Sequence, residues 1–180
     1  MSYAFELYLD ERSEEALRTV WRALDGAGLL SPELKDDARP HVSLCVTDDI
    51  DLDVARRTID HLCIGYNRLK LQLGVLGTFV TEQNVIFVAP TMTDELRRIH
   101  LELNELLHAK GAVVWDYYLP NRWLPHCTLA TAVPESRYME AFAAIRRAFV
   151  PLVATVESLG LVSFLPVKLL HVRPLRLPGA

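Results

Sequence analysis

Two five-residue segments of this chain repeat one pattern 85 positions apart. Pro40–Leu44 and Pro125–Leu129 each consist of a proline, a histidine, any residue, a hydroxyl residue and a leucine. In an extended strand, successive side chains alternate between the two faces, so the histidine and the hydroxyl of each segment share one face. The opposite face is apolar in both segments. Each segment is therefore predicted to be a strand that presents one imidazole and one hydroxyl group.

The order of the predicted elements is repeated as well. Hydrophobic spacing and turn residues predict for the first half the strands Tyr3–Leu9, His41–Val46 and Leu69–Phe79 and the helices Ser13–Asp25 and Leu52–Ile64, the latter capped by Asp49 or Asp51. They predict for the second half the strands Asn84–Ala89, His126–Thr131, Leu152–Glu157, Leu161–Phe164 and Lys168–Val172 and the helices Thr93–Ala109 and Pro134–Phe149, the last with Met139, Phe142 and Ile145 inward.

We infer from this repetition an internal duplication of a β-α-β-α-β unit. Two similar lobes related by a pseudo-two-fold axis would place equivalent surfaces face to face, so that both histidine-bearing faces line one central groove. No linker-like segment separates the halves, and 180 residues suit one domain. The prediction is a single α+β domain over residues 1–180, with lobes of approximately 1–83 and 84–180; whether the lobes exchange strands is left open.

Composition excludes several classes of protein. Apolar residues make up 51% and charged residues 23% of the chain, which indicates a globular protein rather than a disordered one. The net charge of −4 argues against a protein that coats nucleic acid. No secretion signal or membrane-spanning run is visible, and the three cysteines lack a C-x-x-C spacing. These features predict a cytoplasmic protein with reduced thiols, without a membrane or an obligate protein partner.

The two motifs resemble those of the 2H phosphoesterase superfamily, whose hallmark is a pair of H-x-[ST] motifs about one lobe apart. The segment Trp123–Ala130 is especially similar to the second motif, and Gly74–Phe79 with Asn84–Val88 looks like the family's mid-chain glycine–aromatic stretch. Within the superfamily, the 2′-5′ RNA ligase-like and 2′,3′-cyclic phosphodiesterase branches are the most similar. The resemblance implies two antiparallel sheets that form a central groove flanked by helices.

The resemblance also implies roles for four residues. His41 and His126 would be the catalytic pair, and Ser43 and Thr128 would bind the phosphate. General chemistry supports these roles, because hydrolysis of a phosphodiester needs one group to remove a proton from water and another to protonate the leaving oxygen. Two histidines that titrate near neutrality can divide this work, and hydroxyl groups can donate hydrogen bonds to the non-bridging oxygens. Which histidine is the acid is left open here.

An aromatic stretch precedes the second motif. It contains Tyr118, which can stack a nucleobase, and Arg122, which can meet a phosphate. We predict these two residues, together with Phe79, to contact the substrate. The alternative interpretation is that the rings cover the open end of the core. The remaining histidines, His61, His100, His108 and His171, are predicted to be structural or surface residues.

Other sites lack support in the sequence. The acidic run Asp48–Asp53 fails as a calcium loop, because the sixth residue from Asp49 is Val54 rather than glycine, and helix capping explains it better. Neither an H-E-x-x-H pattern nor a phosphate-binding G-x-x-x-x-G-K-[ST] loop is present. We therefore predict no metal and no cofactor.

Three functions remain open at this point. The favoured one is a metal-independent phosphodiesterase that acts on 2′,3′-cyclic or 2′-5′-linked nucleotides or on RNA ends. The alternatives are a 2′-5′ RNA ligase, which is the reverse reaction, and a nucleotide-binding module without turnover. Relatives acting on RNA commonly continue the second motif with a basic residue, whereas Thr131-Ala132-Val133 follows here. The expected partner is thus a nucleotide or a short RNA end, without extended nucleic-acid binding.

Overall fold

The computed structural model describes residues 1–35, 38–164, 167–177 and 179. In this part of the chain, eight antiparallel strands form one sheet in the order β5-β2-β1-β7-β3-β4-β6, with β8 also paired to β7. The strands are β1 (Ser2–Leu9), β2 (His41–Asp48), β3 (Leu69–Thr78), β4 (Ile86–Pro90), β5 (Val113–Val114), β6 (Cys127–Ala130), β7 (Leu152–Phe164) and β8 (Lys168–Pro174).

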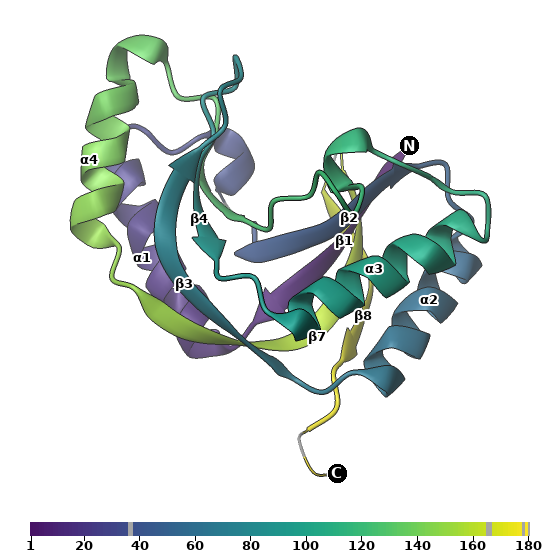
Figure 1. Ribbon diagram of the computed structural model, residues 1–180. Helices are drawn as coiled ribbons and strands as arrows, with labels where there is room; N and C mark the ends of the chain where they lie inside the picture. Colours follow the sequence, from purple (N-terminus) through teal and green to yellow (C-terminus); the bar gives the residue numbers. More distant parts are fainter. Residues whose placement is uncertain (36–37, 165–166, 178, 180) are drawn as a thin grey trace.

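The long strand β7 joins two groups of strands. Its first residues, Leu152–Val156, pair with β3, which continues to β4 and β6. Its later residues pair with β1 on one edge and with β8 on the other. The predicted antiparallel α+β fold is confirmed, with β7 joining what were expected to be two sheets into one. This sheet curves so that the β3–β4 arm and the β1–β2 arm face each other (Figure 1).

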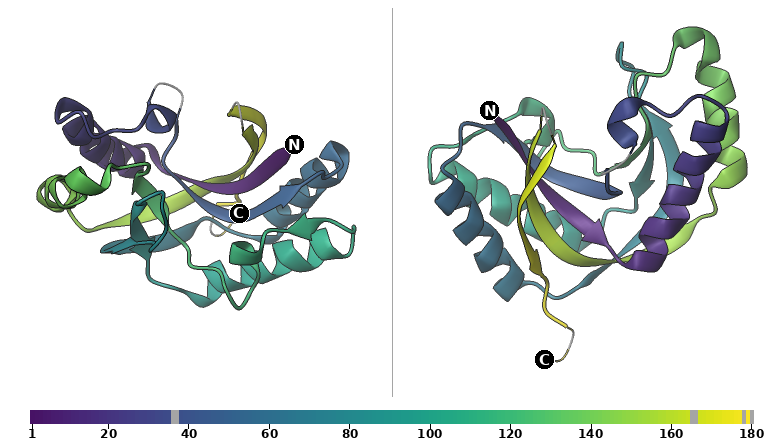
Figure 2. Two further views of the ribbon diagram at one scale, coloured as in Figure 1. Left: turned by 90° about the horizontal axis from the view of Figure 1, so that it is seen from above. Right: turned by 180° about the vertical axis from the view of Figure 1, so that it is seen from behind.

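In the described part of the chain, four α-helices flank the sheet as two pairs. Helix α1 (Glu11–Gly26) packs against α4 (Tyr138–Ala148), and α2 (Leu52–Gly65) packs against α3 (Asp94–His108). The two pairs lie on opposite sides of the molecule in every view (Figures 1 and 2). Each pair combines one helix from each half of the sequence, so the two halves are interleaved in space. Their origin by duplication stays a prediction.

The helix starts follow the capping residues in the sequence. Asp51 caps α2 by accepting a hydrogen bond from the Val54 N–H at 2.8 Å, and Thr93 caps α3 through the Leu96 N–H. Asp10 caps α1 and also accepts a hydrogen bond from the Thr155 N–H at 2.6 Å, which ties the helix to β7. The capping interpretation of Asp51 is confirmed; Asp49, the other candidate, adopts a positive φ of 50° instead.

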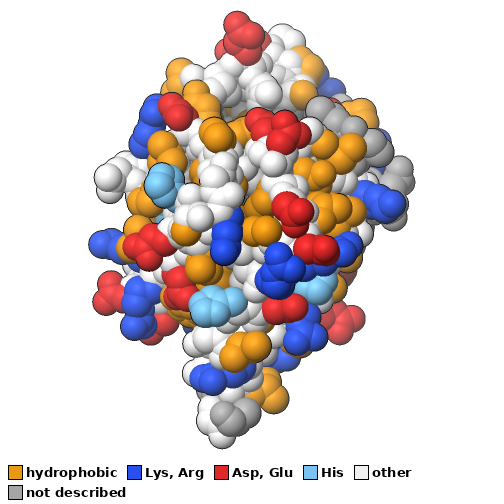
Figure 3. Space-filling view, turned by 90° about the vertical axis from the view of Figure 1, so that its right-hand side faces the viewer, with side chains coloured by type: hydrophobic (Ala, Val, Ile, Leu, Met, Phe, Trp, Pro, Cys, Tyr) orange, Lys and Arg blue, Asp and Glu red, His pale blue; other side chains and the backbone are white. Residues whose placement is uncertain are grey.

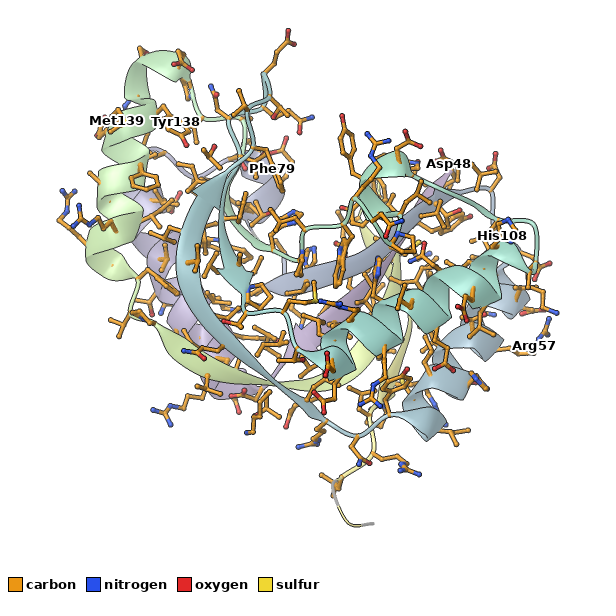
Figure 4. The ribbon with its side chains drawn as sticks, viewed as in Figure 1. Asp48, Arg57, Phe79, His108, Tyr138 and Met139 are labelled. Carbon is orange, nitrogen blue, oxygen red and sulfur yellow. The ribbon has the colours of Figure 1, made fainter. Side chains whose placement is uncertain are left out.

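Two details of the predicted elements are wrong. The two strands predicted for 152–157 and 161–164 are one continuous strand, β7. Gly160 lies within this strand, where a Cβ atom would overlap the Tyr8 ring, so the glycine makes room for a neighbouring side chain. Met139, predicted to face inward, is 72% exposed and points outward from α4 (Figure 4). The buried face of α4 is formed by Ala141, Ala144 and Ile145, and a short 3-10 turn, Glu135–Arg137, precedes the helix.

Candidate active site

The first motif lies at the start of β2, with its two faces in different environments. Val42 and Leu44 are fully buried in the main core, whereas His41 and Ser43 are only partly buried on the opposite face. This is the alternation that the sequence predicted. The buried side chains of Val42 and Leu44 thus anchor the strand on one face, and the imidazole and the hydroxyl group project from the other face.

The second motif is arranged in the same way. Cys127 and Leu129 are buried, and Thr128 is partly exposed. His126 is also partly exposed. It was predicted to be the first residue of a strand, but β6 begins one residue later, at Cys127.

The structure brings the two motifs next to each other. The indole N–H of Trp123 donates a hydrogen bond to the backbone oxygen of Ser43 at 3.0 Å. Strand β2, which begins at His41, also contacts strand β6, which begins at Cys127. A segment from each half of the chain is thereby fixed against the other. A single groove lined by both histidine-bearing faces stays a prediction.

Each histidine ring is held by the same kind of hydrogen bond. Nδ1 of His41 lies 2.7 Å from the backbone oxygen of Arg39, and Nδ1 of His126 lies 2.8 Å from that of Leu124. A carbonyl oxygen only accepts, so Nδ1 carries the hydrogen in both rings. The free nitrogen is therefore Nε2 in each case. It accepts a proton when the ring is neutral and donates one when the ring is charged.

The two rings differ in their electrostatic surroundings. Burial lowers the pKa of His126; the hydrogen bond to Leu124 opposes this shift, and the nearby charge of His41 adds to it. His126 also contacts Phe79 and Phe87, with ring centroids 4.8 and 5.3 Å away. His41, by contrast, lies with Nε2 3.4 Å from the buried carboxylate of Glu6. Burial therefore favours a neutral ring at His126, whereas the ring of His41 faces a carboxylate.

A cavity of about 830 Å³ opens beside the first motif. Among the described residues, its lining includes His41, Ser43, Tyr118, Trp115, Phe164 and Val162. His126 and Thr128 do not line it. The cavity combines aromatic and aliphatic walls with charged side chains at Arg39, Lys35, Lys168 and Glu33. It is large enough for a nucleotide.

The three residues predicted to contact substrate have different positions. Tyr118 lines this cavity, and burial raises its pKa to about 12, against a hydrogen bond with Ser43 that lowers it. Phe79 lies at the inner side of the β3–β4 arm and packs edge-on against His126 (Figure 4). Arg122 is exposed, pairs with Asp116 at 2.8 Å and does not line the cavity. A substrate role for all three stays a prediction.

Some aromatic residues that precede the second histidine belong to the core, and others line the cavity. Trp123 is buried and stacks on His100 at 3.9 Å, so it belongs to the core. Trp115 and Tyr118 line the cavity.

The other histidines lie away from the motif pair. His100 is buried, and its Nε2 is 3.0 Å from the Tyr118 oxygen. His61 pairs with Glu102 and His171 with Asp60. His108 lies at the end of α3, on the far side of the molecule from Phe79 (Figure 4).

Two further residues beside the first motif, Glu6 and Tyr8 on β1, were not among the predicted site residues. Tyr8 pairs with His41 across the ladder, and Glu6 pairs with Ser43. A possible signal was present, since a glutamate and a tyrosine alternate with Phe5, Leu7 and Leu9 in a strand that is otherwise apolar. Only the paired strand identifies them as neighbours of the motif.

The described residues form neither a metal-binding cluster nor a membrane-spanning helix. Among them, no group of three or more histidine, cysteine, aspartate or glutamate side chains is arranged to hold a metal ion. Within the same residues, none of the helices is both long and apolar enough to cross a bilayer.

Comparison with known proteins identifies the family. The model of the 2′-5′ RNA ligase superfamily matches residues 10–166, which include both motifs. The chain belongs to the 2′-5′ RNA ligase superfamily. Its members are 2H phosphoesterases, as the resemblance of the two motifs implied. No curated protein matches this member of the superfamily.

Solved structures share the fold of this 2′-5′ RNA ligase superfamily member at low identity. TT0787 of Thermus thermophilus is 18% identical, with 99% of this chain and 100% of that chain covered and a TM-score of 0.67. E. coli LigT complexed with 3′-AMP is 15% identical, with 96% and 97% covered and a TM-score of 0.65. A structure described as a phosphoesterase is 16% identical, with 97% of both chains covered and a TM-score of 0.64. At such identities the likeness establishes the fold.

Proposed function

We propose that this protein is a metal-independent phosphodiesterase that cleaves 2′,3′-cyclic or 2′-5′-linked nucleotides or RNA ends. One observation carries the proposal. Two imidazoles from repeated motifs lie on segments that contact each other, and each ring is anchored through Nδ1, which leaves its Nε2 for proton transfer. With two such groups, one ring can remove a proton from the nucleophile and the other can donate a proton to the leaving group at one phosphorus atom.

The different surroundings of the two rings support one assignment of the two roles. His126, whose pKa is lowered by burial, acts as the base, and its Nε2 takes a proton from the attacking water. His41, beside Glu6, acts as the acid, and its Nε2 gives a proton to the ribose oxygen that leaves. The water oxygen forms a bond to phosphorus as the bond to the ribose oxygen breaks. The product is a phosphomonoester, and the two rings exchange protonation states.

The hydroxyl groups and the cavity would complete the site. Ser43 and Thr128, on the same faces as the histidines, would donate hydrogen bonds to the non-bridging oxygens as charge develops on them. Tyr118 and the apolar wall at Trp115 would hold the base and sugar. E. coli LigT has been crystallised with 3′-AMP, the type of product that opening a 2′,3′-cyclic phosphate would give.

The net charge of −4 favours a small substrate over a long RNA. On the face formed by α2 and α3, acidic and basic side chains are interspersed rather than gathered in a basic field (Figure 3). Binding to a long RNA rests on many lysine and arginine contacts to phosphates. A nucleotide or a short RNA end is therefore the proposed substrate, and 2′-5′ ligation is the alternative as the reverse of this reaction.

A substrate panel in EDTA tests the proposal. We expect turnover of 2′,3′-cyclic mononucleotides or 2′-5′-linked dinucleotides to be the same with and without EDTA, because both proton transfers are made by side chains. Product analysis by chromatography would show which ester oxygen leaves. Ligation of RNA ends without hydrolysis would favour the ligase. Binding without turnover of any member of the panel would favour the nucleotide-binding module. Loss of turnover in EDTA would contradict the mechanism.

A further inference from the structure

Glu6 is a buried acidic residue that the proposed mechanism has not used. It lies in β1, between the fully buried side chains of Phe5 and Leu7, and is 7% exposed. A carboxylate removed from water is costly unless hydrogen bonds or charges compensate it. Its partners therefore indicate why it is there.

Both oxygens of Glu6 have a partner. Oε2 accepts a hydrogen bond from the Tyr8 hydroxyl at 2.9 Å, and Oε1 lies 3.4 Å from Nε2 of His41. The Tyr8 ring is itself fixed, because it covers Gly160 and lies 4.1 Å from the guanidinium of Arg39. Burial and the charge of Glu6 raise the pKa of Tyr8, so its hydroxyl stays a donor.

The contact with His41 depends on the charge of that ring. Nδ1 of His41 already donates its hydrogen to the Arg39 oxygen, so a neutral ring would turn the Nε2 lone pair toward the Glu6 carboxylate. A protonated ring turns an N–H group of a cation toward it. The distance of 3.4 Å exceeds that of a normal hydrogen bond, so the proton is attracted but not held.

Other charges around His41 come from several elements. Arg39 disfavours a second positive charge, but its Nε donates to Glu14 of α1 at 2.6 Å. His126, which directly precedes β6, repels a positive charge on His41 when it is itself protonated. Further charged groups on the same cavity are Lys35, Glu33 and Lys168. Glu6 is the carboxylate in contact with the ring.

We propose that Glu6 is a positioning residue that keeps His41 protonated and aimed as the general acid. The inference rests on the proposed function, since it assigns Glu6 a task within that reaction. Tyr8 holds the carboxylate in place from the other side. Glu6 itself transfers no proton in this account.

The chain contains a matched control pair on its surface. Glu102 accepts a hydrogen bond from the Tyr66 hydroxyl at 2.7 Å with one oxygen, and its other oxygen lies 3.0 Å from Nε2 of His61. The same three residue types are therefore arranged in the same way, far more exposed: the side chain of His61 is 61% exposed and that of His41 is 35% exposed. Because solvent screens such a pair, its electrostatic coupling is weaker.

Titration of the histidine rings by NMR in the free protein tests the coupling directly. In E6Q, which keeps the shape of the side chain, we expect the titration midpoint of His41 to fall by about one pH unit. His61 should be unaffected in E6Q. In E102Q the midpoint of His61 should fall by less, and His41 should be unaffected. A His41 midpoint that is the same in E6Q and the unmodified protein would overturn the inference.

Kinetics then separates this inference from the proposed function. We expect E6Q to lower kcat about tenfold with little change in KM, and to move the alkaline limb of the pH profile to lower pH; E6D should recover part of kcat. Lower activity with an unmoved alkaline limb would mean that Glu6 acts through folding alone and would overturn the inference. An unmodified protein that cleaves no member of the panel would instead refute the proposed function, and the NMR comparison would still decide whether Glu6 controls His41.

Discussion

Replacing either motif histidine by alanine is expected to lower kcat/KM for a 2′,3′-cyclic mononucleotide by about 10²–10⁴-fold. His41 and His126 act on the same phosphorus atom at the same moment in the proposed reaction, so loss of either leaves one proton transfer without a partner. At about 1.4 kcal/mol per factor of ten, this is about 3–6 kcal/mol of transition-state stabilisation.

The double variant separates cooperation from simple addition. Groups that act as one unit lose most of their effect with the first substitution, so H41A/H126A is expected to be only slightly slower than each single variant. The matched control is H61A, which removes an exposed histidine that also contacts a carboxylate. Circular dichroism would verify that each variant folds. A single motif variant that keeps a tenth or more of the activity would contradict the assignment.

The second large effect concerns stability rather than catalysis. Burial lowers the pKa of His100 to about 4, whereas an unfolded chain would titrate this residue near 6.5. Above pH 6.5 the ring is neutral in both states. As the pH falls from 6.5 toward 4, His100 becomes protonated in the unfolded chain but stays mostly neutral in the folded protein. The free energy of unfolding therefore falls by about 3 kcal/mol across this window from His100 alone.

Urea unfolding at pH 7, 5.5 and 4.5 would measure this loss. In H100Q the residue no longer titrates, so we expect a lower stability at pH 7, where the stacking on Trp123 is lost, but a flatter dependence on pH. Asp10 and His126, whose pKa values are also lowered, titrate in both proteins and cancel in the comparison. H61Q serves as the exposed control. Equal slopes for H100Q and the unmodified protein would show that His100 does not carry the effect.

His100 also shows where sequence patterns stop being informative. Its sequence neighbours suggest an ordinary helix position, and it was expected to be structural or on the surface. Its role depends on Trp123, which lies 23 positions later and stacks on it while holding Ser43 through the indole N–H. Such a contact between α3, a loop and β2 leaves no periodic trace in the sequence.

The motif pair was predictable for the opposite reason. A strand of period two fixes which side chains share a face, and the repeated context of His41 and His126 identified the same chemistry twice. The helices α1, α2 and α3 were also predictable within two residues, because cap residues and apolar spacing are local signals. The continuity of β7 was not, since the reason for Gly160 is the ring of Tyr8 on another strand.

Glu6 lies between these cases. Its position in an apolar strand is visible in the sequence, but its meaning comes from the register in which β1 pairs with β2. That register is decided by which faces are buried and by the irregularity between Phe5 and Glu6. The strand can be predicted from a single sequence, but its pairing register with β2 cannot.

The most direct measurement for the whole account is a crystal structure of the protein with a nucleoside 2′- or 3′-monophosphate. The account predicts one phosphate between the rings, with Nε2 of His41 and Nε2 of His126 both within hydrogen-bond distance of its oxygens. The hydroxyls of Ser43 and Thr128 should point at the same group. A phosphate that contacts only one of the two rings, or that binds away from both, would contradict it.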